Sequence, residues 1–212
     1  MTMATEEVTD ENGHHFFSWE KTYVFIDGSN LYQSAQALDF DIDFQRLRTY
    51  FQKRCPNIMR MYYFTAIPPH TGRTTKNLVD WMGHNGYKCV VKSTKEFTSP
   101  SGERKLKGNM DIELAVEAMG LIKVMDHAII FSGDGDFVPL IESLQRQGVR
   151  VTVVSTKQTP SPIASGELRK VADGFMDLVS IRSHICAQPN KDIMDTLRPK
   201  PAHTSSPNLV DA

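Results

Sequence analysis

The sequence has few of the features that mark secreted or membrane proteins. It contains only three cysteines in 212 residues, and Cys55, Cys89 and Cys186 form no CxxC pair. This spacing argues against a zinc site or a disulfide framework and favours reduced thiols. No apolar run approaches the length of a membrane span, and the polar start MTMATEEVTDENGHH is unlike a secretory signal. We therefore expect a cytoplasmic protein without a membrane partner.

The chain also lacks a strong net charge, since its formal value is −1 at pH 7. No global field attracts nucleic acid, so any such partner must be bound by a local patch. Hydrophobic residues make up 40% of the chain, which is enough for one core and one domain. We predict a domain over 19–182, an acidic disordered tail over 1–18, and a disordered tail containing Pro and Ser over 183–212.

Short apolar runs alternate with helical patterns through the middle of the chain. Predicted strands cover 22–27, 57–67, 87–92, 127–132 and 149–155, with a further one near 175–179. Helices are expected between them, including 29–38, capped by Ser29 or Asn30, and 109–124. Alternation of this kind predicts a three-layer α/β/α fold with a mostly parallel sheet. In such sheets, sites form at the carboxyl ends of strands, near the reversal of strand order.

Four aspartates lie where that rule places a site. Asp27 ends the first strand, Asp134 and Asp136 follow the strand 127–132, and Asp111 lies in the first turn of the helix 109–124. Each also has a structural interpretation, as a turn residue, a helix cap or a helix-dipole acid. However, a cap explains only one aspartate of SGDGDF, and two adjacent carboxylates repel one another unless a cation lies between them.

Asp111 is the most informative of the four. Helical spacing places it on the side of Ala115, Ala118 and Ile122, so it shares the inward face of its helix. An inward carboxylate is costly without a partner, which is Lys107 or a metal ion. A site made only of carboxylates suits Mg²⁺ or Mn²⁺, ions that bind phosphates and activate water.

Four motifs together resemble the NYN domains, in particular the LabA-like branch of the PIN-like nuclease fold. They are VFIDGSNLY (24–32), KGNMDIELAVEAM (107–119), SGDGDFVPLI (132–141) and GVRVTVVS (148–155). GNMD departs slightly from the GVD-like run that is more usual in this branch. The resemblance implies a ribonuclease site with one or two metal ions. It assigns that site to Asp27, Asp111, Asp134 and Asp136, with Asn30 and Ser132 as supporting polar groups.

A local basic segment leads into Asp111. It supplies Lys92, Lys95, Arg104, Lys105 and Lys107, and Arg73 adds to the same edge. These cations are candidates for binding the backbone of single-stranded RNA. The alternative is an ordinary solvated loop or hairpin.

Two functional hypotheses follow. The first is an Mg²⁺- or Mn²⁺-dependent ribonuclease, and the second is a non-catalytic regulator that binds RNA or protein with the same fold. The sequence leaves open a homodimer, a protein partner bound through the tails, the RNA that is recognised, and endo- or exonucleolytic cleavage.

Overall fold

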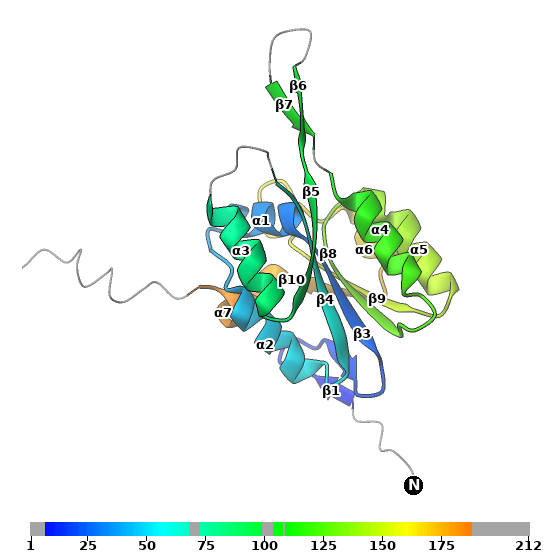
Figure 1. Ribbon diagram of the computed structural model, residues 1–212. Coiled ribbons are helices and arrows are strands. Elements are labelled where there is room, and N and C mark those ends of the chain that lie inside the picture. Colours follow the sequence, from blue (N-terminus) through cyan, green and yellow to red (C-terminus); the bar gives the residue numbers. More distant parts are fainter. Residues whose placement is uncertain (1–6, 68–72, 99–103, 108, 188–212) are drawn as a thin grey trace, which may run out of the picture.

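The computed structural model describes residues 7–67, 73–98, 104–107 and 109–187. Its centre is a six-stranded sheet in the order β10-β9-β8-β3-β4-β5 (Figure 1). Its strands are β3 (Thr22–Asp27), β4 (Ile58–Ile67), β5 (Tyr87–Ser93), β8 (His127–Phe131), β9 (Arg150–Ser155) and β10 (Gly174–Asp177). Every neighbouring pair is parallel. The predicted α/β fold with a mostly parallel sheet is therefore confirmed.

The strand order reverses next to β3. The chain proceeds from β3 outward to β4 and β5, then returns to β8 on the other side of β3 and continues outward to β9 and β10. The carboxyl ends of β3 and β8 therefore form the switch point, where open α/β sheets bind their ligands. Both strands are fully buried, because helices cover the two faces of the sheet.

The helices form two layers (Figure 1). One core cluster combines one face of the sheet with α1 (Gly28–Ala37), α2 (Phe44–Arg54), α3 (Arg73–His84) and α7 (Leu178–Ile185). The other combines the opposite face with α4 (Asp111–Gly120), α5 (Val138–Arg146) and α6 (Gly166–Val171). A short 3₁₀ turn, η1 (Gly135–Phe137), precedes α5. Consecutive β3 residues alternate between the clusters, as Val24 and Ile26 join one and Phe25 the other.

The N-terminal segment differs from its prediction as a disordered tail. Strands β1 (Glu7–Thr9) and β2 (His15–Phe17) form an antiparallel hairpin, and Phe16 is 2% exposed in the core. The turn is held by buried Asp10, whose carboxylate accepts hydrogen bonds from His14 N at 2.8 Å and Tyr50 Oη at 2.9 Å. One buried aromatic ring and one satisfied carboxylate therefore order a stretch that is otherwise polar.

The C-terminal boundary also lies later than predicted. Helix α7 follows β10 directly and continues to Ile185, which is buried, and Ile42 pairs with Cys186 in an isolated bridge. The folded region thus includes residues 183–187, which the sequence assigned to the tail. The rest of that predicted tail, from 188 onward, lies outside the described residues.

The basic connector forms a second antiparallel hairpin. Strands β6 (Lys95–Thr98) and β7 (Arg104–Lys107) pair so that Lys95 lies opposite Lys107. The hairpin continues from β5 and projects beyond the carboxyl-end edge of the sheet (Figure 1). Helix α4 begins four residues after β7 and ends at Gly120, earlier than the predicted 124.

Candidate metal centre

Asp27 is the last residue of β3 and the N-cap of α1. Its Oδ1 accepts hydrogen bonds from Ser29 N at 3.1 Å, Ser29 Oγ at 3.0 Å and Asn30 N at 3.2 Å. The helix cap is therefore Asp27, and the prediction of Ser29 or Asn30 was wrong. Asp27 is only 6% exposed, and these bonds fix its carboxylate at the end of the strand.

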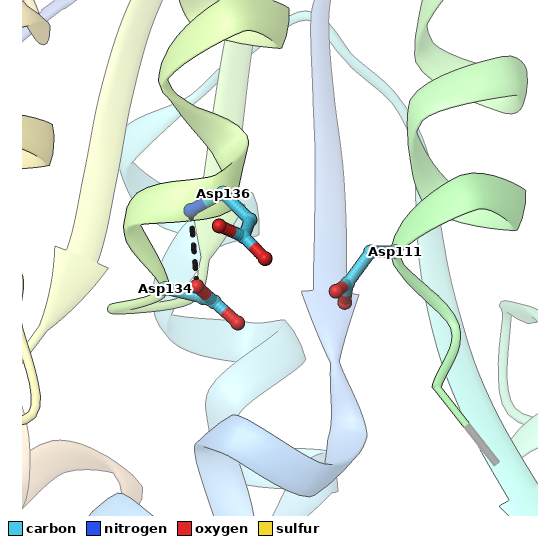
Figure 2. Close-up of side chains that lie close together, drawn as sticks. All are labelled: Asp111, Asp134 and Asp136. Carbon is cyan, nitrogen blue, oxygen red and sulfur yellow. Dashed lines mark hydrogen bonds between the residues drawn. The ribbon is translucent and has the colours of Figure 1, made fainter. Parts of the chain in front are cut away.

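Three other aspartates converge on one point beside it. Figure 2 shows Asp111, from the start of α4, facing Asp134 and Asp136, from the turn between β8 and α5. One carboxylate oxygen from each lies within 4.8 Å of the others. Asp134 Oδ1 also accepts a hydrogen bond from Asp136 N at 3.0 Å, which shapes the turn. The fold thus brings together carboxylates that are more than 20 residues apart in the chain.

The charges of this acidic cluster are mutually unfavourable. Burial raises the pKa of Asp27, and the negative charge of Asp134 raises it further, against the hydrogen bonds from Asn30 and Ser29. Burial also raises the pKa of Asp111, and the charges of Asp27, Asp134 and Asp136 add to that effect. Among the described residues, no salt bridge involves any of the four aspartates. Hydrogen bonds offset part of the repulsion, to Asp27 from Ser29 and Asn30 and to Asp111 from Asn109 Nδ2 at 2.5 Å. The helix N-termini at α1 and α4 add to this effect.

The two predicted supporting residues connect the loops that carry the acids. Asn30 Oδ1 accepts a hydrogen bond from Gly133 N at 2.9 Å, which ties α1 to the turn after β8. Ser132 Oγ, which is buried, accepts one from Asp134 N at 3.2 Å. A Cβ at Gly133 would lie 2.4 Å from the carbonyl oxygen of Ile163, so only glycine fits there. These residues hold the carboxylates in place and are not themselves part of the cluster.

A small cavity of about 160 Å³ opens next to Asp27, on the side of α4. Its lining includes Asp27, Ser29, Thr94 and Met110. Thr94 is buried, and its Oγ1 has no hydrogen-bond partner within the described ranges. The sequence pointed to Ser29 only as a helix cap and did not point to Thr94. The signal for Thr94 was its place just after the predicted strand 87–92, at the same edge of the sheet.

The predicted basic residues belong to elements at this edge of the sheet. Lys92 is half-exposed and pairs with Glu113 of α4 at 2.6 Å, so it neutralises an acid outside the cluster. Lys95 lies on β6, and Arg104, Lys105 and Lys107 lie on β7, while Arg73 begins α3. The side chains of these five residues lie outside the described part of the structure.

The donor set fits a hard divalent cation. It consists of carboxylate oxygens alone, without imidazole or thiolate, which favours Mg²⁺ or Mn²⁺ over zinc. A cation would also remove the repulsion that raises the pKa values of Asp27 and Asp111. Asp111, Asp134 and Asp136 could hold such an ion, with Asp27 at its side.

Comparisons with known proteins agree with this architecture. A curated relative, the low amplitude and bright protein LabA of Synechococcus elongatus, is 32% identical over 166 residues, covering 76% of this chain and 86% of LabA. A solved structure of a protein of unknown function from Vibrio parahaemolyticus superposes with a TM-score of 0.62 at 21% identity, covering 75% of this chain and 93% of that one. That likeness concerns the fold alone. No described helix is long and apolar enough to cross a membrane. The sequence model of the NYN domain family matches residues 21–181 of this chain. The chain therefore belongs to the NYN domain family, whose fold is PIN-like.

Proposed function

We propose that this protein is a metal-dependent ribonuclease that hydrolyses phosphodiester bonds of single-stranded RNA. The observation that carries the proposal is the cluster of Asp111, Asp134 and Asp136 within 4.8 Å at the switch point of the sheet. Such a cluster is costly unless it binds a cation. When bound there, Mg²⁺ or Mn²⁺ polarises a phosphoryl oxygen and lowers the pKa of a coordinated water.

The residues of the chain would each have a separate task. Asp111, Asp134 and Asp136 would hold one or two cations, and Asp27 would orient the attacking water from the end of β3. Asn30 and Ser132 would keep the two acidic turns in register through their hydrogen bonds to Gly133 and Asp134. Preorganisation of this kind avoids the cost of arranging charged groups during the reaction.

The β6–β7 hairpin supports RNA as the substrate. It carries Lys95, Arg104, Lys105 and Lys107 and precedes α4, which begins with Asp111. A basic projection beside an acidic cluster suits a polyanion whose backbone crosses the cluster. The exposed cation Lys92 and the first residue of α3, Arg73, extend the same edge. The three free cysteines fit a protein that acts in the reducing cytoplasm.

The test is cleavage of a 5′-labelled single-stranded RNA with Mn²⁺, Mg²⁺ or EDTA. We expect cutting that requires the metal and falls at least about 100-fold in Asp134→Asn, because loss of one ligand removes several kcal/mol of charge stabilisation. Asparagine still caps η1, so the fold should persist by circular dichroism. Asp39→Asn, at an exposed position away from the cluster, is the matched control.

Undiminished cutting by both Asp134→Asn and Asp27→Asn would refute the catalytic assignment. RNA binding without metal-dependent cutting in the unaltered protein would favour the non-catalytic regulator instead.

A further inference from the structure

A second cavity, of about 200 Å³, lies on the opposite side of the β3–α1 junction from the first. Its inner wall includes Leu31 of α1, Phe44 of α2, Leu78 of α3 and Tyr63 of β4. Its rim includes Tyr32, Gln36 and Asp41, all exposed. The cavity is therefore an apolar slot with a few polar groups at its mouth, which is the usual composition of a small-ligand site.

The slot and the cavity beside the acidic cluster are lined by consecutive residues of the chain. Gly28 lines the slot, and Asp27, its neighbour in the chain, lines the cavity beside the cluster. A Cβ at Gly28 would lie 2.7 Å from Tyr63 Oη and 2.8 Å from the carbonyl oxygen of Phe64. Glycine therefore allows α1 to start directly on β4 and keeps the junction thin. The slot and the cavity beside the cluster therefore adjoin the same thin junction, on either side of consecutive residues.

We propose that this slot binds an unpaired base of the RNA next to the phosphate at the acidic cluster, with Tyr32 stacking on that base. The inference rests on the proposed function and deepens it, because it names the part of the substrate that is bound beside the metal centre.

The composition of the rim favours a base over an apolar side chain of a protein. Tyr32 is 64% exposed and lines the slot, so its ring is available for stacking. Bases offer a flat face for stacking and edges that both donate and accept hydrogen bonds. The carboxamide of Gln36 can do both, and the carboxylate of Asp41 accepts from an amino group. An apolar side chain would make no hydrogen bond with either group.

The experiment measures binding rather than cleavage, so that it does not depend on catalysis. The full chain is titrated against a fluorescently labelled single-stranded RNA in Ca²⁺, a hard cation that takes the same oxygen ligands as Mg²⁺ and Mn²⁺. The dissociation constant is read from fluorescence anisotropy. A second probe is a ribose-phosphate oligomer of equal length that lacks bases. The variants are Tyr32→Ala, Tyr32→Phe and, as a matched control on the exposed side of α1, Gln33→Ala.

We expect Tyr32→Ala to weaken RNA binding about 5- to 150-fold, the range that stacking of one base contributes. Tyr32→Phe and Gln33→Ala should bind RNA like the unaltered protein, and the abasic oligomer should not distinguish Tyr32→Ala from it. Equal RNA binding by Tyr32→Ala and the unaltered protein would overturn the base slot. An equal loss on the abasic oligomer would also overturn it, because Tyr32 would then contact the backbone. A selective loss in a protein that never cuts RNA would keep the slot and refute only the nuclease.

Discussion

Charged groups lie at both ends of the central sheet, but within the described part of the chain they are paired at one end and unpaired at the other. At the carboxyl ends of β3 and β8, four aspartates gather without a cation among the described side chains. At the opposite end of the sheet, where β3, β8 and β9 begin, Glu20, His127 and Arg150 form a network in which the charges of Glu20 and Arg150 are paired. Both groups of residues lie at ends of the same sheet, and they differ in how their charges are paired.

The paired network is almost closed to solvent. Glu20 is 2% exposed and accepts two hydrogen bonds from Arg150, at 2.7 and 2.5 Å. Arg150 also donates to His127 Nδ1 at 3.1 Å, and since a guanidinium only donates, that nitrogen carries no proton. The other nitrogen, Nε2, therefore donates to Thr152 Oγ1 at 2.9 Å. Burial and the charge of Arg150 together hold the pKa of His127 well below its usual value.

A buried charge that is fully paired needs no further ligand. Like charges held close together repel one another, and a bound cation removes that repulsion. The amino-end network thus serves the fold, where Arg150 also stacks over Phe17 of the N-terminal hairpin at 5.2 Å. The acidic cluster weakens the fold when no ion is bound, and in the proposed function it is the metal site. The contrast between these two ends leads to four predictions about the free energy of unfolding.

The largest change is expected from Arg150→Met. It leaves the carboxylate of Glu20 buried without its partner, which costs about 3–5 kcal/mol. Urea unfolding followed by circular dichroism measures the loss. Arg146→Met is the control, because Arg146 is exposed and its 3.9 Å pair with Glu142 is worth less than about 1 kcal/mol. A loss no greater than that of the control would contradict the structural role of the network.

A divalent cation should have the next largest effect, in the opposite direction. At about 100 times its dissociation constant, Mn²⁺ raises the free energy of unfolding by about 2.7 kcal/mol if it binds only the folded chain. Asp134→Asn should lose most of this increment. Arg146→Met should keep it, because Arg146 is exposed at the other end of α5 from the acids. An unaltered protein that gains nothing from Mn²⁺ or Mg²⁺ would contradict a metal centre at the cluster.

The sequence predicted this contrast only in part. The aspartates were recognisable because each follows a buried strand or opens a helix, and a parallel sheet brings such positions to one edge. The network of Glu20, His127 and Arg150 was not recognisable from the sequence. Its residues come from three segments, and their contacts depend on side-chain geometry rather than on a regular spacing. The order of residues 7–17 was missed for the same reason, since it depends on the single contact of Asp10 with Tyr50 and on the burial of Phe16.

The local detail of the site was also beyond the sequence. That Asp27 caps α1 depends on its backbone conformation, with φ −70° and ψ 103°, which a turn composition of Asp, Gly, Ser and Asn does not specify. Likewise, the roles of Asn30 and Ser132 as links between turns follow from which loops the sheet places side by side.

A smaller effect is expected from relieving the repulsion directly. In EDTA, Asp134→Asn removes a charge that raises the pKa of Asp27 and of Asp111. We expect the free energy of unfolding to rise by about 1 kcal/mol or less, because solvent screens the more exposed members of the cluster. Asp39→Asn should change nothing. A destabilised Asp134→Asn variant would show that the carboxylate supports the turn more than it strains the cluster.

The smallest predicted effect is in the pH dependence, where the two ends should oppose one another. The raised pKa values of Asp27 and Asp111 mean that the folded protein binds protons there before the unfolded chain does. Their contribution to stability is therefore fully present at low pH and is lost as the pH rises through the folded pKa values. The lowered pKa of His127 acts in reverse, since its contribution is present above about pH 6.5 and is lost below it.

Two variants separate these opposing contributions. On acidification from pH 7, the contribution of His127 begins to be lost near its usual pKa of 6.5, and that of Asp27 and Asp111 is gained as the pH falls through their raised pKa values. His127→Gln should reduce the loss of stability on acidification in EDTA, and Asp134→Asn should increase it. With saturating Mn²⁺, the aspartates of the cluster should stay charged, so that their raised pKa values no longer contribute to the pH dependence of stability. The ion is itself released when the aspartates bind protons. The increment given by Mn²⁺ should therefore shrink as the pH falls. An increment that grows on acidification would mean that the ion binds elsewhere than at these aspartates.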